Sequence, residues 1–333
     1  MVFIAVVWIL GLCISKTADY LYENNINVER LKGETAGIRR AWFVFVKSIP
    51  IIGKRKKPFK ALRGVTFEIH SGMFGLLGPN GAGKSTFMRI VTGILRQSYG
   101  TVFINGMDTL KYREELQSLI GFLPQEFGMY ESMSAWDFLN YQAILKGITD
   151  EKVRNERLEY VLTSVHMYEQ RNSAIGSFSG GMKQRLALAQ SLLGDPEIVI
   201  LDEPTAGLDP KQRIAIRNYI ASVALNKTVI IATHVVSDVE FIAREAIMLK
   251  KGVISDSGSP YELTQKIEGQ VWQTVVAAEE VQAMQEKFRV VNIQNGEQGV
   301  ILRILSDVKP TEDSVTVVPS LEDYYLYVFG DIL

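Results

Sequence analysis

The stretch GPNGAGKST runs from Gly78 to Thr86, between the apolar run Met73–Leu77 and the apolar-periodic run Phe87–Leu95. This order predicts a strand, a glycine-rich turn and the first turn of a helix. Backbone N–H groups converge at such a turn, and the helix dipole favours negative charge there. The stretch therefore predicts a nucleotide-phosphate site formed by Gly78, Pro79, Asn80, Gly81, Ala82, Gly83, Lys84, Ser85 and Thr86.

Two side chains of this stretch have the chemistry that phosphate and its metal ion require. Lys84 is placed to reach the β- and γ-phosphate oxygens, and the Ser85 hydroxyl can take a position on Mg²⁺. An ordinary glycine-rich β-turn before a helix is the alternative, but all positions of the nucleotide-binding pattern are filled. The sequence therefore predicts ATP and Mg²⁺ as ligands.

Two adjacent carboxylates follow the continuous apolar run Ile198–Leu201, which is typical of a strand buried on both faces of a parallel sheet. Open α/β sheets bind ligands beyond the carboxyl ends of their strands. We expect Asp202 to hold Mg²⁺ through water and Glu203 to act as general base for the attacking water. A solvated turn with two acids is the alternative, and the phosphate loop upstream argues against it.

Composition bounds the class of protein. The chain has 333 residues, 47% of them hydrophobic, and a formal net charge of −1, so it can bury a core and gives no reason to expect nucleic acid as a partner. Cys13 is the only cysteine, which excludes an intrachain disulfide and is consistent with a reducing compartment.

The first 60 residues differ from the rest. Residues 1–14 are almost wholly apolar and lack the basic n-region of a secretory signal, and ten Lys or Arg residues lie between Arg30 and Lys60. Residues 38–49 also place Trp42, Phe45, Val46 and Ile49 on one helical face. We expect direct membrane contact through residues 1–60; packing on a membrane partner or on the core, or a start codon further downstream, are the alternatives.

These motifs, with SFSGGM at 177–182 and TAGLDP at 205–210, resemble the ATP-binding-cassette (ABC) transporter family over about residues 59–258, with further similarity at the C-terminus. Phe178 and Met182 replace the Leu and Gln of the usual LSGGQ signature. The resemblance implies a P-loop α/β cassette with a mostly parallel sheet core, an antiparallel β subdomain, a helical subdomain and a small C-terminal α/β extension.

The resemblance also implies further site residues. Phe59 is the nearest candidate to stack on adenine, and it lies closer to Gly78 than is usual in the family. Gln125 is expected to contact Mg²⁺ and the attacking water, and His234 the γ-phosphate. The signature residues that are expected to contact the nucleotide of a second cassette are Ser179, Gly180 and Gly181, and Asp209 is expected to cross to the partner. Lys84, Gln125, Glu203 and His234 are the expected catalytic residues.

The chain divides on this basis into residues 1–57, an ATPase domain at 58–260 and a C-terminal accessory region at 261–333. Within the ATPase domain we expect a strand with alternating burial at 65–69, a hairpin at Asn105-Gly106 and a helical subdomain at about 126–193. The accessory region is expected to form a hairpin around Asn295-Gly296 and to end in a strand and an aromatic-rich helix.

The predicted function is ATP binding and hydrolysis on the cytoplasmic face of the cell membrane, powering export through a separate transmembrane permease. A second ABC ATPase, identical or different, is the expected partner that completes the site. A ribosome- or DNA-directed cassette and a regulatory ATP-binding cassette are the alternatives. Ribosomal members normally carry two cassettes in one chain and DNA-repair members carry long coiled-coil insertions. Glu203, Gln125 and His234 together argue against a regulatory role.

Overall fold

The computed structural model describes residues 59–330. The chain forms two units, residues 1–59 and residues 60–333, and all the helices and strands described lie in the second unit. The expected membrane-contacting segment and basic amphipathic helix lie outside the described residues, apart from the last positions of that region. Among the described residues, no helix is both long enough and apolar enough to cross a membrane.

A six-stranded sheet forms the centre of the larger unit, with five parallel strands and an antiparallel edge strand. In spatial order its strands are β4 (Ile120–Leu123), β5 (Ile198–Asp202), β6 (Thr228–Thr233), β1 (Met73–Leu77), β7 (Glu245–Lys250) and β8 (Val253–Gly258). The predicted strands before the phosphate loop, before Gln125, before Asp202 and before His234 are all present. The mostly parallel sheet core is confirmed.

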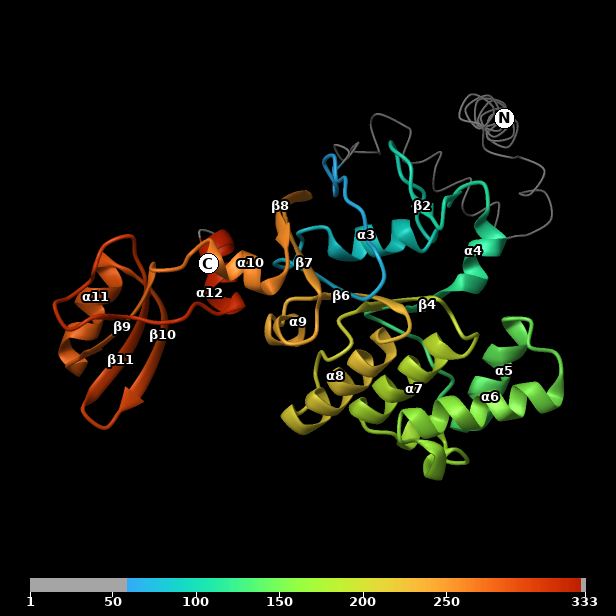
Figure 1. The fold of residues 1–333 in the computed structure, drawn as a ribbon. Helices are drawn as coiled ribbons and strands as arrows, with labels where there is room; N and C mark the ends of the chain where they lie inside the picture. Colours follow the sequence, from blue (N-terminus) through green and yellow to red (C-terminus); the bar gives the residue numbers. More distant parts are fainter. Residues whose placement is uncertain (1–58, 331–333) are drawn as a thin grey trace, which may run out of the picture. The chain divides into compact units, whose positions relative to one another are not determined.

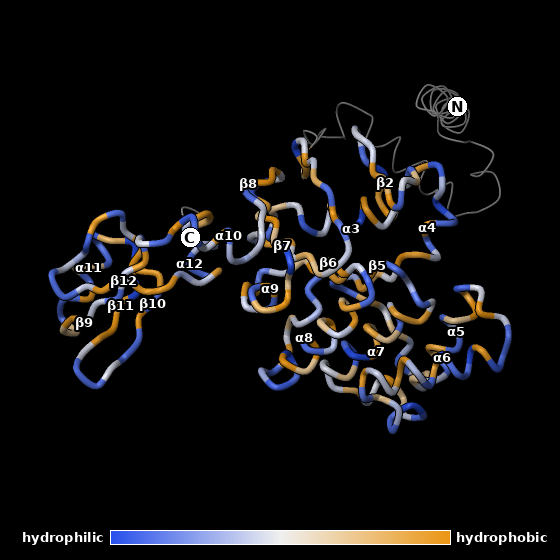
Figure 2. The backbone as a smooth tube through the Cα atoms, viewed as in Figure 1, coloured by the Kyte–Doolittle hydropathy of each residue, from blue (hydrophilic) through white to orange (hydrophobic). Residues whose placement is uncertain are grey.

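Successive side chains of the buried strands belong alternately to two separate hydrophobic clusters, one on each face of the sheet. On β5, Val199 and Leu201 join the larger cluster, whereas Ile200 joins the smaller one. Helix α3 (Lys84–Val91) covers the second face and helix α7 (Gly180–Leu192) the first, as Figure 1 shows. Figure 2 shows hydrophobic residues along the central strands, as expected for strands buried on both sides.

The strand register brings the loops that carry the predicted site residues to one edge of the sheet. Leu77 pairs with Thr233, and Leu201 pairs with both Ile231 and Leu123. Because these strands are parallel, their carboxyl ends meet at the same edge.

Further helices connect the strands of this sheet or follow its last strand. They are α4 (Arg113–Leu119), α5 (Ala135–Leu145), α6 (Glu151–Ser164), α8 (Pro210–Ala224), the short α9 (Ser237–Glu240) and α10 (Pro260–Gln265). Within the residues predicted to form a helical subdomain, about 126–193, the structure has the helices α5, α6 and α7, which pack on one another.

The hairpin predicted at Asn105-Gly106 is confirmed, and the strand predicted at residues 65–69 is wrong. Strands β2 (Phe103–Ile104) and β3 (Met107–Asp108) flank Asn105 and Gly106, both of which have positive φ. Residues 65–69 do alternate in burial, but they form no strand ladder. Their apolar side chains pack against the smaller core cluster, and this packing alone explains the alternation.

The C-terminal part contains a four-stranded antiparallel sheet and two helices. In spatial order its strands are β10 (Arg289–Gly296), β11 (Gly299–Leu305), β9 (Val271–Val276) and β12 (Val315–Thr316), and its helices are α11 (Val281–Lys287) and α12 (Leu321–Phe329). The predicted hairpin exists, but Asn295 and Gly296 belong to β10, and residues 297–298 connect the strands. The strand and aromatic helix predicted at the end are β12 and α12.

Helix α12 is held to β11 by an ion pair between the buried Asp323 and the partly buried Arg303. Arg303 donates from Nε to Asp323 Oδ1 at 2.8 Å and from Nη2 to Oδ2 at 2.6 Å. The N-cap Ser320 and Asp323 also exchange hydrogen bonds in a capping box. Burial by itself raises the pKa of Asp323, but the hydrogen bonds from Arg303 and Ser320 outweigh it and hold that pKa below its usual range.

Replacing Asp323 by Asn should lower the free energy of unfolding by about 2 kcal/mol at neutral pH, because Arg303 loses its charged partner. A carboxyl group whose pKa is lower in the folded than in the unfolded state stabilises the folded protein. This contribution is complete above the pKa of the unfolded state, about 3.9, and is lost as the pH falls through the pKa of the folded state. The difference in Tm between the two proteins should therefore shrink below about pH 4. Thermal unfolding at several pH values checks this, with the exposed neighbour change Glu322→Gln as the control. Equal Tm values for the parent and Asp323→Asn at pH 7 contradict the assignment.

Candidate active site

The phosphate loop joins the end of β1 to the start of α3, which begins at Lys84. Gly81 and Gly83 have φ values of 79° and 111°, which favour glycine. A Cβ atom at Gly78 would collide with the carbonyl oxygen of Leu249 on β7. The glycines therefore allow a backbone path that turns the N–H groups of a helix N-terminus toward a ligand.

Lys84 is buried and lies across its own loop. Its Nζ donates to the carbonyl oxygen of Gly78 at 2.6 Å and lies 3.9 Å from Oε1 of Glu203. Burial lowers the pKa of Lys84, although the charges of Glu203 and Asp202 oppose that shift. The amine is held between the loop and the carboxylates, where an added phosphate would favour its charged form.

Asp202 is the last residue of β5, and its side chain meets Ser85 of α3. Burial raises the pKa of Asp202, a hydrogen bond from Ser85 lowers it, and the charge of Glu203 raises it further. Its Oδ1 is buried without a hydrogen-bond partner among the described residues. A carboxylate oxygen and a hydroxyl next to a phosphate loop fit Mg²⁺, which is usually held by one or two carboxylates and the substrate phosphates. The described residues contain no group of three His, Cys, Asp or Glu that could form a metal site without such phosphates.

Glu203 follows directly and points its carboxylate to a different set of partners. Its Oε1 lies 2.9 Å from Nδ1 of His234, and its Oε2 accepts from the Thr233 hydroxyl at 3.3 Å. The backbone of Glu203 has φ 54°, an unusual value for a residue other than glycine, and its N–H donates to the carbonyl oxygen of Ala232 at 2.8 Å. The structure thus brings Glu203, His234 and Lys84 together at one buried carboxylate.

Gln125 and Phe59 are both exposed. Gln125 lies two residues beyond β4, and Leu123 of that strand pairs with Leu201. The loop that carries Gln125 therefore leaves the same edge of the sheet as Asp202. The Phe59 side chain is 82% exposed, and its stacking on adenine stays a prediction.

The signature residues begin α7 and lie beside the start of α8. Ser179 caps α7 by accepting a hydrogen bond from the Met182 N–H at 3.3 Å. Gly181 lies against Gln212, where a Cβ atom would collide with the Gln212 side chain. Asp209 caps α8 through the N–H of the same Gln212, at 2.9 Å. Ser179 and Asp209 are both exposed, so the two helix starts offer one surface to a ligand or partner.

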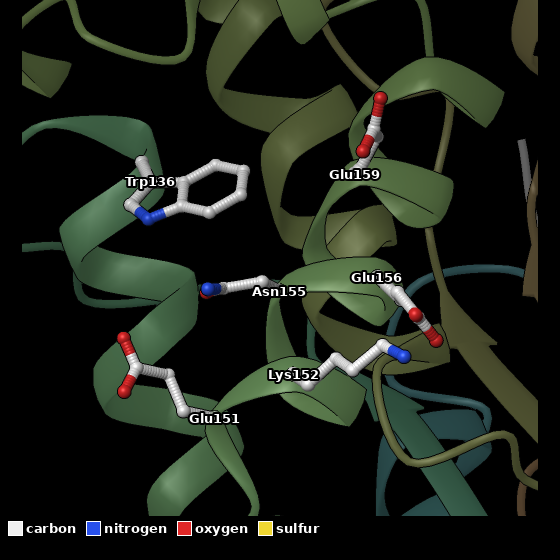
Figure 3. A pocket seen from close by; sticks show the side chains of 6 residues that line it. All are labelled: Trp136, Glu151, Lys152, Asn155, Glu156 and Glu159. Carbon is white, nitrogen blue, oxygen red and sulfur yellow. The ribbon is translucent and has the colours of Figure 1, made fainter.

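A separate hollow of about 540 Å³ lies between α5 and α6 and is not suited to phosphate. Its lining residues are Trp136, Glu151, Lys152, Asn155, Glu156 and Glu159, shown in Figure 3. Three carboxylates against one ammonium group repel an anionic ligand. This hollow therefore does not compete with the phosphate loop as the candidate nucleotide site.

Three residues near the site were missed by sequence reasoning. Thr233 binds the carboxylate of Glu203, and buried Asp238 accepts a hydrogen bond from the Thr205 hydroxyl. Thr233 directly precedes His234, and Thr205 follows Glu203 by two positions, so proximity to the motifs was an available signal. The pairing of Asp238 with Thr205 joins residues 33 positions apart, and no local pattern indicates it.

The fold and these loops define a P-loop nucleoside triphosphatase. The family model described as "ABC transporter" matches residues 62–206. The ABC transporter ATP-binding protein NatA of Bacillus subtilis is 34% identical over 208 residues, which cover 62% of this chain and 84% of NatA. The uncharacterized ABC transporter ATP-binding protein YxlF of the same species is 36% identical over 220 residues, covering 66% and 72%.

Solved structures agree with the family match. A dimeric ATP-binding cassette in a post-hydrolysis state, bound to ADP and Pi, aligns with a TM-score of 0.55 at 27% identity, covering 60% of this chain and 90% of that one. The structure of cbiO1 from Clostridium perfringens, part of an ABC transporter complex, aligns with a TM-score of 0.55 at 28% identity, covering 62% and 84%.

The chain belongs to the ABC transporter family as an ATP-binding cassette that hydrolyses ATP. Such cassettes generally work as dimers together with transmembrane partners. This chain spans most of its bacterial relatives, but only 26% of ABC transporter A family member 8 of Arabidopsis thaliana, to which it is 34% identical.

Proposed function

We propose that this chain is the ATP-hydrolysing subunit of an exporter and works on the cytoplasmic face of a cell membrane with a separate permease. The observation that supports hydrolysis is the contact of the buried Glu203 carboxylate with Nδ1 of His234, 2.9 Å apart, beside Lys84 and the phosphate loop. The resemblance of the C-terminal strand and aromatic helix to the end of exporter-type cassettes supports the direction of transport. The match to this chain covers 72% of one relative and 84% of another, and both relatives are named as ABC transporter ATP-binding proteins.

In this proposal the loop Gly78–Thr86 binds the phosphates of ATP, and Lys84 turns from the Gly78 carbonyl oxygen to the β- and γ-phosphates. Glu203 accepts a proton from the attacking water, and His234 orients the Glu203 carboxylate and reaches the γ-phosphate. Mg²⁺, held by Ser85 and Asp202 and approached by Gln125, would neutralise charge that develops on the phosphates.

A second cassette completes the site. Ser179, Gly180 and Gly181 offer the N-terminus of α7 to the γ-phosphate bound by the other protomer. Asp209, at the start of α8 on the same chain, reaches across the interface to that protomer. ATP thereby joins the two subunits through charge-assisted hydrogen bonds, and hydrolysis releases them. This closure and opening drives the permease through the loop at Gln125 and the helices α5 to α7.

Purification from detergent-solubilised membranes tests the assignment. The full-length tagged chain should bring with it a membrane-spanning protein in a fixed ratio, and the complex should hydrolyse ATP. The Lys84→Ala chain is the matched control, because it should retain the membrane partner and lose hydrolysis. Recovery of the chain with ribosomes or nucleic acid, and without a membrane-spanning protein, contradicts the proposal.

A further inference from the structure

A buried side-chain hydrogen bond joins the two turns that carry Glu203 and His234. Asp238 lies on α9, four residues after His234, and is 0% exposed. Its Oδ2 accepts a hydrogen bond from the hydroxyl of Thr205, which is 1% exposed and lies two residues after Glu203. The bond therefore fixes the distance between the turn after β5 and the turn after β6.

The helix that carries Asp238 rests on the sheet itself. Val239 lies against Gly75 of β1, where a Cβ atom would collide with the Val239 side chain. The N–H of Asp238 donates to the carbonyl oxygen of Val235 at 3.1 Å. Because α9 packs directly on the backbone of a central strand, Asp238 offers Thr205 a rigid attachment point.

The turn that Thr205 stabilises is the one whose conformation is unusual. Glu203 has φ 54°, a strained backbone conformation for a residue other than glycine, which persists only when its surroundings hold it. On one side the Glu203 N–H is held by the carbonyl oxygen of Ala232 at 2.8 Å. On the other side, two residues after Glu203, the buried Thr205 side chain is held in place because its hydroxyl donates a hydrogen bond to Asp238.

We propose that Asp238 is a positioning residue for ATP hydrolysis, which holds Thr205 so that the Glu203 carboxylate stays against His234. Asp238 acts through these residues and does not touch the nucleotide. The inference rests on the role proposed above for Glu203 as general base. It predicts that loss of the Asp238–Thr205 bond lowers turnover and leaves nucleotide affinity unchanged.

The test uses the full-length chain in its purified membrane assembly. Asp238→Ala and Thr205→Val should each lower kcat by about 10- to 100-fold, since a misplacement of about 1 Å can cost that much. KM for ATP should stay within about twofold, because the phosphate loop is untouched. Asp238→Asn and Thr205→Ser keep an acceptor and a donor, and they should restore most of the turnover. The double change Asp238→Ala with Thr205→Val should be no worse than either single change.

Two controls separate positioning from simple stabilisation. Ser237→Ala alters an exposed side chain on the same helix and should leave kcat and Tm unchanged. In a Glu203→Gln background, Asp238→Ala should lower the residual hydrolysis no further, because its effect passes through the Glu203 carboxylate. A purely structural role for Asp238 would lower that residual rate by the same factor as in the parent, which overturns the proposal.

Failure of this inference can be told apart from failure of the proposed function. If Glu203→Gln abolishes turnover while Asp238→Ala keeps the parent kcat, or raises KM alone, the positioning role is wrong and the base assignment stands. If Glu203→Gln itself keeps the parent kcat, the base assignment fails, and the positioning role fails with it.

Discussion

Replacing Glu203 by Gln should lower kcat for ATP hydrolysis by about 100-fold or more, while the affinity for ATP stays near that of the parent. The amide has the shape of the carboxylate but cannot accept the proton of the attacking water. Glu203 contacts His234 and Thr233 and lies 3.9 Å from Lys84, so it lies at the edge of the sheet where we propose that ATP reacts. Phosphate release at saturating ATP measures kcat, and a binding titration measures affinity.

A control substitution at a second glutamate shows whether the loss of kcat is specific to Glu203. Glu197 lies just before β5, is exposed and contacts Asn105 at 3.1 Å. Glu197→Gln removes a carboxylate of the same kind outside the site and should leave kcat unchanged. A Glu203→Gln assembly that hydrolyses ATP at the parent rate would show that another group activates the water.

The second large effect concerns nucleotide binding. Lys84→Ala should weaken ATP binding by the full-length chain about 10- to 100-fold, because the loss of charge-assisted hydrogen bonds to phosphate costs on the order of 1.5–3 kcal/mol. The Lys84 ammonium also contacts the Gly78 carbonyl oxygen at 2.6 Å, so its removal takes away the side chain that crosses the loop toward Glu203. Isothermal titration of the full-length chain with ATP measures the loss.

Ser179→Arg is the companion change, because it alters the other half of the proposed composite site. Ser179 is exposed at the start of α7, and its hydroxyl accepts a hydrogen bond from Met182 within its own helix. An arginine there should spare ATP binding by the isolated chain and block dimer closure. Equal losses of binding in Lys84→Ala and Ser179→Arg contradict a site shared between two protomers.

Much of the nucleotide-binding edge could be predicted because its signals are local. Continuous apolar runs such as Ile198–Leu201 indicated strands buried on both faces, and the structure places Val199 and Ile200 in opposite core clusters. Each such run ended in a motif residue. Since parallel strands end at one edge, the sequence order of strand and motif was enough to bring Lys84, Asp202, Glu203 and His234 to that edge.

The rest could not be predicted because it depends on contacts between distant residues. Alternation at residues 65–69 reports which side chains are buried, but it does not report whether the backbone has a partner strand. The bond of Asp238 to Thr205 and the ion pair of Arg303 with Asp323 join residues 33 and 20 positions apart. The residues that connect the two strands of a hairpin were also not predicted correctly. Asn295 and Gly296 are typical turn residues, but in the structure they belong to β10 and pair with β11.

The C-terminal helix α12 is attached to α9, the short helix that follows His234. Glu240, at the end of α9, accepts a hydrogen bond from the Leu321 N–H of α12 at 2.8 Å. Burial raises the pKa of Tyr325 on α12, and the charge of Glu203 raises it further. Helix α12 is therefore in contact with the helix that comes after His234.

In the proposed cycle, ATP joins two cassettes, and Glu203 then acts as the general base in its hydrolysis. Light scattering during size-exclusion chromatography of the full-length Glu203→Gln chain tests this most directly. We expect a mass near twice 37.3 kDa with ATP and Mg²⁺, and a mass near 37.3 kDa with ADP or after the further change Ser179→Arg. A Glu203→Gln chain that binds ATP in solution and still elutes with the mass of a single chain would contradict it.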